Sequence, residues 1–294
     1  MAPGAAGHGG EGAERGLPVW CNDRPVKAKV YVIVGSHACR TATLMLEHKQ
    51  IPYRLIELPT GLHPLLVRAA GFAGHRTPIR TVEGSTHGQL AMLDRLGTVP
   101  AMVLDRERSQ TNREIALQLE RVRPDPSLFP VEPGRRQRVE EVERWGDGVL
   151  QMAARRLLLA TPVEDLRERG TGGRLGPLLT RSDRLRGVLA RRAGKAFRAG
   201  EGNAEELLRA IPPLLDAVDG WVEEGTLHSG PATVADFTIA PSLALLSYRP
   251  DLDRELARRP AGRVMDRLLP DPDASPGWPV STTSAAPASA LPRS

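Results

Sequence analysis

The sequence predicts an α/β domain followed by an all-α domain. Short β-branched segments alternate with helical segments up to the proline-rich stretch RPDPSLFPVEPG, and every periodic segment after residue 130 has helical spacing. We therefore expect an α/β domain over 27–124, a linker over 125–134 and a helical domain over 135–270.

The elements of the first half can be assigned in chain order. AKVYVIV (28–34) is a β-branched run that predicts a buried strand, and the residues after it have the apolar spacing of a helix. IPYRLIEL (51–58) predicts a second strand, and TVPAMVLDRER (98–108) predicts a third that leads through a polar turn into a strand pair. NREIALQLERV (112–122) predicts a helix with Asn112 as its N-cap. This order predicts a mixed sheet with helices against it.

Three segments of the second half have helical patterns. RRQRVEEVERWGDGVLQMAARRLLLA (135–160) predicts one long helix with an apolar face. NAEELLRAIPPLLDAVDGWVEEG (203–225) predicts another, bent at Pro212 and Pro213 because a proline inside a helix removes a hydrogen bond. TVADFTIAPSLALL (233–246) is apolar on all sides, which predicts a buried helix.

Composition narrows the class of protein. The formal net charge is +5, but aromatic residues make up 4% of the chain, so the positive charge lacks the stacking platforms of nucleic-acid-binding proteins. Cys21 and Cys39 are too few for a disulfide framework. No apolar run approaches the ~20 residues that a membrane span needs. We expect a cytoplasmic protein without a nucleic-acid or membrane partner.

Both ends of the chain are predicted to be disordered tails. Residues 1–26 are rich in glycine, alanine and proline, and residues 271–294 in serine, alanine and proline, so neither buries enough apolar surface to fold. GTGGRLG (170–176) has the glycines of a phosphate-binding loop, but no strand precedes it. We interpret that segment as a flexible connector.

Three motifs lie at the ends of predicted elements. Ser36 lies where a strand ends and a helix begins, which is the position of an N-cap hydroxyl. In GTVPAMVL, Pro100 directly precedes a strand, and a cis bond after Val99 would turn the backbone groups of Val99 outward. Thr233 and Asp236 have the spacing of a capping box. Each motif alone has a structural explanation.

In this order and spacing, the three motifs resemble those of the cytosolic glutathione transferases, and the resemblance covers about residues 28–270. SHACR resembles that family's serine- or cysteine-xxC active-site start, TVPAMVL its cis-proline loop, and TVADFTIAP its buried helix with a capping box. The resemblance implies a thioredoxin-like amino-terminal domain followed by an all-helical carboxy-terminal domain. It also implies glutathione as a substrate and no metal.

The resemblance implies a catalytic role for Ser36. In the family, the matching residue donates a hydrogen bond to the sulfur of glutathione and favours the thiolate. A hydrogen bond to a charged group is worth roughly 1.5 to 3 kcal/mol, and a helix N-terminus adds about 0.3 to 1 kcal/mol for a nearby anion. Because one pKa unit corresponds to about 1.4 kcal/mol, the two together can lower a thiol pKa from about 8.5 towards 7. A pure helix cap is the alternative for Ser36.

The thiol site would have several neighbours. His37 and Cys39 follow Ser36 directly, and the Cys39 thiol is expected to pack against the sheet. Serine at the first position of this SxxC pattern argues against disulfide exchange. The glutathione-binding positions implied by the resemblance are Val99, Pro100, Gln110, Thr111 and Asn112. Thr111 and Asn112 replace the family's acidic or glutamine residue and serine, which implies a reshaped turn or weaker binding.

The electrophile pocket in the family lies between the two domains. The resemblance implies that Trp145 and Met152, on one face of the helix over 135–160, line this pocket. Domain core is the alternative for both side chains.

The connection between the second and third strands is longer than is usual in the family. It predicts an insertion near 73–96, because loops of this length are uncommon unless they are functional or mobile. His63, His75 and His87 lie in this connection without the spacing of metal ligands, and we expect them to be solvated.

The function that these observations favour is thiol activation followed by conjugation to an apolar electrophile, as in a glutathione S-transferase. The resemblance implies a detoxification enzyme that forms a homodimer. Two alternatives remain open. One is a non-catalytic module that binds a ligand or a protein, and the other is a glutathione-dependent lyase, reductase or isomerase on the same fold.

Overall fold

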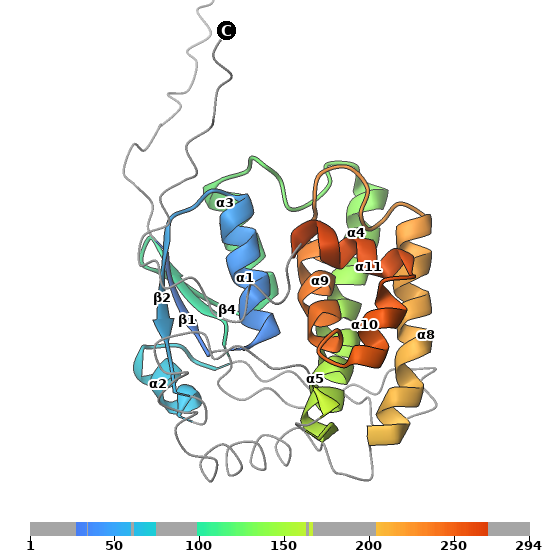
Figure 1. Ribbon diagram of the computed structural model, residues 1–294. Coiled ribbons are helices and arrows are strands. Elements are labelled where there is room, and N and C mark those ends of the chain that lie inside the picture. Colours follow the sequence, from blue (N-terminus) through green and yellow to red (C-terminus); the bar gives the residue numbers. More distant parts are fainter. Residues whose placement is uncertain are drawn as a thin grey trace, which may run out of the picture.

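Figure 1 shows the computed structural model of the protein, which describes residues 28–33, 35–59, 62–74, 99–162, 165–166 and 204–269. Several predictions lie outside the described residues. They concern both tails, the insertion from residue 75 onward, the connector over 170–176, and Cys21, His75 and His87.

The first half forms a four-stranded mixed sheet with helices, as the sequence predicts. Its elements are β1 (Ala28–Val32), α1 (His37–His48), β2 (Tyr53–Glu57), α2 (His63–Ala69), β3 (Ala101–Leu104), β4 (Glu107–Gln110) and α3 (Asn112–Val122). The strand order is β2-β1-β3-β4, with β1 parallel to β2 and the other pairs antiparallel. This is the arrangement expected from a strand, a helix, a strand and then a strand pair.

The burial of α1 and β1 explains why these elements form. Val30 and Val32 of β1 are almost fully buried, and Met45 and Leu46 of α1 have no exposed surface. The short helix α2 falls within the long connection after β2. His63, its first residue, is half-buried, and this burial lowers its pKa. The prediction that His63 is solvated is therefore wrong.

The second half is helical in all its described elements. These are α4 (Pro133–Trp145), the π-helix η2 (Gly146–Leu150), α5 (Gln151–Ala160), α8 (Ala204–Glu223), α9 (Val234–Leu246), α10 (Pro250–Leu256) and α11 (Pro260–Leu268). α8 continues through Pro212 and Pro213. In Figure 1, α9 lies among the other helices of this half, and nearly all its side chains are buried. Its all-round apolar sequence predicts this position.

The predicted long helix over 135–160 forms, and within it a π-helical turn that the sequence pattern did not predict joins α4 to α5. The turn contains Gly146 and Gly148, and glycine has a low helix propensity. A Cβ at Gly146 would lie 2.8 Å from Ile239 Cδ1 and 3.2 Å from Thr238 Cγ2. Glycine therefore allows α9 to approach this turn closely, a tertiary contact that the local sequence pattern does not contain.

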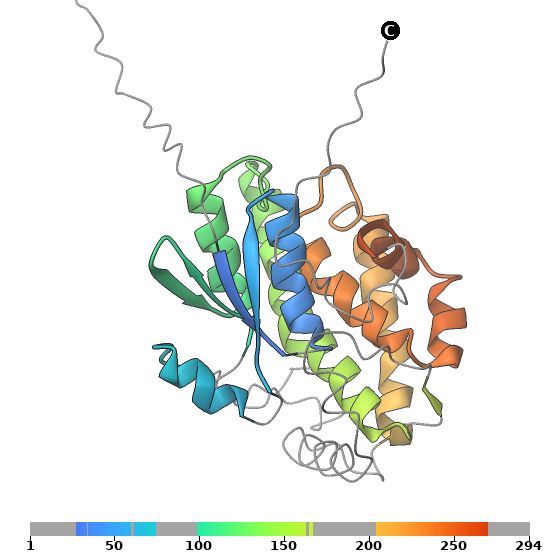
Figure 2. The same cartoon turned by 60° about the vertical axis from the view of Figure 1, so that its left-hand side comes forward.

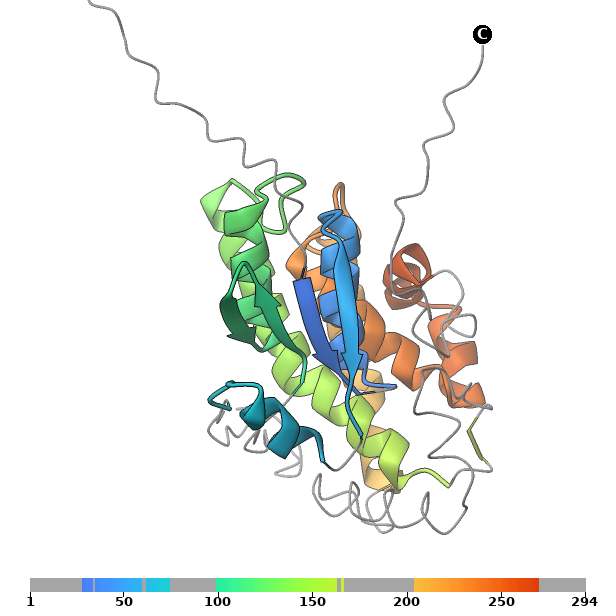
Figure 3. The ribbon, with the colours of Figure 1, turned by 90° about the vertical axis from the view of Figure 1, so that its left-hand side faces the viewer.

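Helix α1 joins the two halves. In Figure 2, α1 lies between the strands and α9, and Figure 3 shows the same order from the side of the sheet. The rings of His48 on α1 and Phe237 on α9 have centroids 5.1 Å apart. At the end of α1, the fully buried Lys49 ammonium donates to Glu120 Oε2 at 2.5 Å and to the Pro124 carbonyl oxygen at 3.0 Å. The ion pair fixes the end of α1 to α3, and the second hydrogen bond fixes it to the residue that precedes the linker.

Candidate functional site

Three loops meet at one edge of the sheet. Tyr31 of β1 lies opposite Ala101 of β3, and Ala101 lies opposite Gln110 of β4. The chain therefore leaves β1, enters β3 and leaves β4 at the same edge. There, the Thr111 N–H donates to the Pro100 carbonyl oxygen at 3.4 Å. The register thus gathers the three predicted parts of the thiol site.

Ser36 is the N-cap of α1. Its backbone is extended, with φ −82° and ψ 112°, and its Oγ accepts a hydrogen bond from the Cys39 N–H at 3.3 Å. Gly35, at φ 72°, makes the turn that precedes it, a conformation that glycine adopts without steric cost. The hydroxyl is half-buried at the positive end of the helix. The cap is confirmed, and it leaves the hydroxyl in a position suited to binding an anion.

Cys39 packs in the core beneath Ser36, as predicted. Its side chain has no exposed surface, and burial raises the pKa of its thiol to about 11. Hydrogen bonds from the Ser36 side chain and at the Ile33 backbone lower this pKa, as does the positive charge of Arg155, but burial outweighs them. Cys39 is therefore a neutral thiol at neutral pH, which removes the basis for a redox role.

The peptide bond between Val99 and Pro100 is cis. The resemblance implied this geometry, and the structure confirms it. Both residues are buried, and the strand β3 starts directly after them.

The start of α3 differs from the prediction. Thr111, not Asn112, is the N-cap, and its Oγ1 accepts from the Glu114 N–H at 3.2 Å. Glu114 Oε2 in turn accepts from the Gln110 N–H at 2.8 Å. The prediction of Asn112 as the cap is therefore wrong. The T-x-x-E pattern over 111–114 is typical of a capping box, and this signal would have located the cap correctly.

Thr111 has an unusual backbone conformation. Its φ is 105°, in a region that β-branched residues rarely adopt. Such positions concentrate at functional sites, where surrounding contacts hold them. The next residue, Asn112, is 3% exposed, and its Oδ1 accepts no hydrogen bond within the described residues. Gln110 is also buried and accepts from the Gly74 N–H at 3.1 Å through Oε1.

The helical domain contributes one cation that the sequence reasoning missed. On α5, Arg155 donates to Gln151 Oε1 at 3.2 Å and to Met152 Sδ at 3.4 Å. Met152 is 1% exposed. The i,i+3 and i,i+4 spacing of these residues on the predicted helix is the signal that points to a restrained guanidinium. Trp145 packs edge-on against Trp221 of α8, with ring centroids 4.7 Å apart, which is a contact within the helical domain.

A second missed cation connects the two domains. Arg113 on α3 donates to Glu143 Oε2 at 2.8 Å and to Glu140 Oε2 at 3.0 Å, both on α4. Glu143 is 2% exposed, and burial raises its pKa to about 7, opposed by Arg113 and reinforced by Asp147. This buried carboxylate belongs to the domain interface.

The capping box of α9 is confirmed, and it has a structural role. Asp236 Oδ2 accepts from the Thr233 N–H at 2.8 Å, and its Oδ1 accepts from the His228 N–H at 2.8 Å. The hydrogen bond from Thr233 is buried, and the one from His228 is partly buried. The Asp236 carboxylate therefore fixes both the start of the helix and the loop before it.

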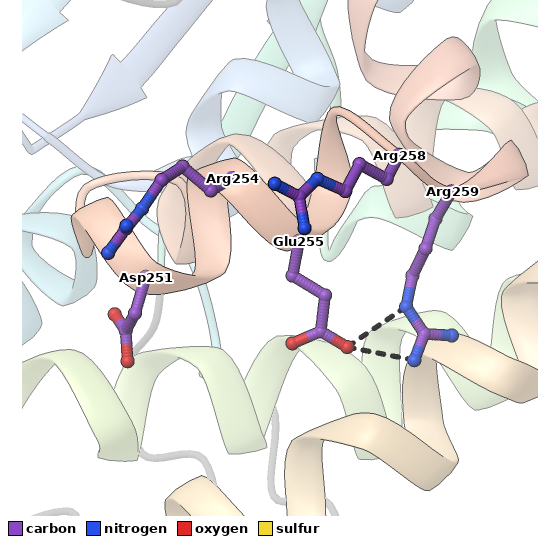
Figure 4. A pocket seen from close by; sticks show the side chains of 5 residues that line it. All are labelled: Asp251, Arg254, Glu255, Arg258 and Arg259. Carbon is purple, nitrogen blue, oxygen red and sulfur yellow. Dashed lines mark hydrogen bonds and ion pairs between the residues drawn. The ribbon is translucent and has the colours of Figure 1, made fainter.

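A cavity of about 340 Å³ lies over α10 and the turn after it. Figure 4 shows its charged lining, in which Arg259 contacts Glu255 at 2.8 Å. Arg259 also contacts Asp216 and Asp219, so its charge is matched by carboxylates. The lining contains no residue of the predicted thiol site.

Two features are absent from the part of the chain that the structure describes. That part contains no group of three or more histidine, cysteine, aspartate or glutamate side chains that could hold a metal ion. None of the helices over the same residues combines the length and the apolar composition that crossing a membrane requires.

Comparison with known proteins supports the fold. No family model matches the sequence, and no curated protein does. A glutathione S-transferase of Ceriporiopsis subvermispora, solved in complex with glutathione, matches with a TM-score of 0.54 and 14% identity, over 83% of this chain and 97% of that one. A glutathione S-transferase from Methylobacillus flagellatus, solved with glutathione bound, matches with a TM-score of 0.51 and 15% identity, over 85% and 98% of the two chains.

A third match differs in length. A GST-like protein from Pseudomonas syringae matches over 83% of this chain but 66% of its own, with a TM-score of 0.49, which is too low to support a statement on fold. The chain has the fold of the solved glutathione transferases, a thioredoxin-like domain followed by an all-helical domain.

Proposed function

We propose that this protein binds a small thiol, most simply glutathione, beside Ser36 and activates it as a thiolate for attack on an apolar electrophile. The observation that carries the proposal is the Ser36 hydroxyl, half-buried at the N-terminus of α1, where its Oγ accepts from the Cys39 N–H at 3.3 Å. The glutathione bound in two solved structures of the same fold supports the choice of thiol.

The chemistry needs only these groups. The thiol loses its proton to solvent, and the Ser36 hydroxyl and the helix N-terminus stabilise the negative sulfur. The thiolate then forms a carbon–sulfur bond with the electrophile, whose leaving group departs with the electron pair or whose carbanion takes up a proton. Holding both reactants at one site supplies the remaining acceleration.

The residues around Ser36 have proposed roles in binding the thiol. The backbone of Val99, ahead of the cis-Pro100, would hold the peptide part of glutathione. Gln110, Thr111 and Asn112 would hold its γ-glutamyl end, since the Thr111 N–H and the Pro100 carbonyl join these two loops. Trp145 and Met152 would line the electrophile pocket. Met152 is the weaker candidate because it is 1% exposed, whereas Trp145 is half-buried.

The test is thiolate absorbance in the ultraviolet, measured as a difference spectrum with and without glutathione. We expect the thiolate band in the wild-type protein and its loss in Ser36→Ala. Because Ser36 also caps α1, the substitution costs about 1 kcal/mol of folding stability, so the melting temperature falls only slightly. A Ser36→Ala protein that keeps the band would overturn the assignment of Ser36. Cys39 does not interfere, since its thiol is buried and neutral at neutral pH.

One observation favours a second candidate, a module that binds a thiol or a protein without turnover. Thr111 and Asn112 depart from the pair that holds glutathione in the family, and Asn112 is almost fully buried. Retention on a glutathione matrix together with conjugation of a model electrophile would support the enzyme. Retention without conjugation, and without any lyase, reductase or isomerase reaction, would support the binding module.

We also propose a homodimer, which light scattering after size-exclusion chromatography would detect.

A further inference from the structure

The cavity over α10 has no part in the proposed function. Its volume of about 340 Å³ lies within the range of small-molecule sites, and every described residue of its lining is charged. Figure 4 shows these residues, which are Asp251, Arg254, Glu255, Arg258 and Arg259. Such walls give an apolar molecule little to bind, so the cavity suits a charged ligand.

Both carboxylates of the lining are bound by arginines. Arg249 donates to Asp251 Oδ1 at 3.1 Å and to Asp251 Oδ2 at 2.8 Å. Glu255 Oε1 lies 2.8 Å from a guanidinium nitrogen of Arg259. Each negative charge of the lining therefore already has a cationic partner.

Arg259 is engaged on the side away from the cavity as well. It donates to Asp216 Oδ1 at 2.6 Å and to Asp219 Oδ2 at 2.8 Å, two residues of α8 that are not part of the lining. Asp219 Oδ1 also accepts from the Ala261 N–H at 2.7 Å. These contacts join α8 to the start of α11, so we assign Arg259 a structural role.

Arg254 and Arg258 are different, because neither has a carboxylate partner among the described residues. Arg254 Nε donates to the Pro250 carbonyl oxygen at 3.0 Å, which is a neutral acceptor. The Arg258 side chain makes no hydrogen bond or ion pair to any described residue. In Figure 4, no interaction joins either side chain to the rest of the lining. Both side chains are exposed, and both bring an unmatched positive charge to the cavity.

The two arginines lie on one face of the same helical turn. The turn continues past the end of α10, since the Ala257 N–H donates to the Asp253 carbonyl oxygen at 3.0 Å and the Arg258 N–H to the Glu255 carbonyl oxygen at 3.1 Å. Residues four apart on a helix are neighbours, and two like charges at this spacing repel each other. An anion bound between Arg254 and Arg258 removes that repulsion.

We propose that Arg254 and Arg258 bind a phosphate group of a small molecule in this cavity. A phosphate group carries up to two negative charges and three acceptor oxygens, so it can pair with both guanidinium groups at once. The planar guanidinium also matches phosphate in bidentate geometry. A carboxylate has a single charge and leaves one of the two arginines unmatched. The site is independent of Ser36 and of thiol binding.

The experiment is isothermal titration calorimetry of the full-length protein with inorganic pyrophosphate. It is done at about pH 8, where phosphate groups are fully ionised, and at constant ionic strength, because salt screens exposed charges. The variants are Arg254→Gln, Arg258→Gln and the double substitution. Arg263→Gln is the matched control, since Arg263 is an exposed arginine of α11 that lies outside the lining.

We expect saturable binding to a single site on the wild-type protein. Because a hydrogen bond to a charged group corresponds to roughly a tenfold change in affinity or more, each single variant should bind about tenfold more weakly. The double variant should show no measurable binding, and Arg263→Gln should keep the wild-type affinity. Succinate, whose two charges lie on separate carboxylates, should bind more weakly than pyrophosphate.

Three results would overturn the proposal. A wild-type protein that does not bind pyrophosphate has no such site, and its two arginines are solvated surface charges. An equal loss of affinity in Arg263→Gln would show that net charge is responsible and not the cavity. Succinate binding as tight as that of pyrophosphate would refute the choice of phosphate. Because both side chains are exposed, the variants should keep the wild-type midpoint of urea unfolding, which shows that a loss of binding is not a loss of folding.

Discussion

The stability of the domain interface should depend on pH through Glu143. Its carboxylate is 2% exposed, and burial raises its pKa from the ordinary value of 4.5 to about 7. Between these two values, the folded protein binds a proton that the unfolded chain does not. Folding stability therefore rises as the pH falls from about 7 towards 4.5. Above pH 7 the buried Glu143 carboxylate is ionised, and burying that charge lowers the folding stability.

The size of the effect follows from the shift. One pKa unit corresponds to about 1.4 kcal/mol, so the full shift corresponds to about 3 kcal/mol at most. In Glu143→Gln, the amide resembles the protonated acid and can still accept from Arg113. We expect this variant to be more stable than the wild type by about 1 to 3 kcal/mol at pH 8 and equally stable near pH 5.

The assay is urea unfolding at a series of pH values for the wild type and the variant. Subtracting the two curves cancels the histidines and other groups that titrate in both proteins. Glu140→Gln is a control of opposite sign, because hydrogen bonds from Arg113 and Arg136 lower the pKa of Glu140 despite some burial. Removing that carboxylate should destabilise the protein at neutral pH. A difference between wild type and Glu143→Gln that does not change from pH 5 to about pH 8 would refute the reasoning.

Two further substitutions test the buried polar contacts. Lys49→Met removes the partner of Glu120 and should cost about 3 to 5 kcal/mol of unfolding free energy, because it breaks a buried ion pair from one side. Asp236→Ala leaves the backbone N–H groups of Thr233 and His228 without their acceptor, which should cost about 2 to 5 kcal/mol in the same urea assay.

Both substitutions have informative controls. Asp236→Asn keeps an acceptor oxygen and should cost less than Asp236→Ala. Arg121→Gln breaks an exposed ion pair with Glu107 and should change the unfolding free energy by less than about 1 kcal/mol. A loss for Lys49→Met no larger than that for Arg121→Gln would show that the buried pair adds nothing beyond a surface contact.

Local patterns in the sequence were sufficient for most of the elements. The β-branched run at 28–34 and the helical spacing after it predict β1 and α1, because both signals arise from one-sided or complete burial of neighbouring residues. The box formed by Thr233 and Asp236 was equally predictable, since its partners lie within one turn. The cis bond before Pro100 followed from the resemblance alone, as the local residues favour trans.

What the sequence did not predict depends on contacts between distant segments. The π-turn at Gly146 faces Ile239 on a helix nearly a hundred residues away, so no local period reveals it. The ion pair between Arg113 on α3 and Glu143 on α4 likewise requires the two domains to be placed against each other. The cap at Thr111 instead of Asn112 has a local cause, since Thr111 Oγ1 accepts from the Glu114 N–H and Glu114 Oε2 accepts from the Gln110 N–H.

The position of α1 has a consequence for cooperativity. One face of this helix lies on the sheet, and His48 on the other meets Phe237 of α9, while the Val234 N–H at the start of α9 donates to the Leu128 carbonyl oxygen in the linker. Each lobe therefore covers apolar surface that the other would expose to water if it stood alone. The two lobes form one folding unit, in which loss of either removes the support of the other.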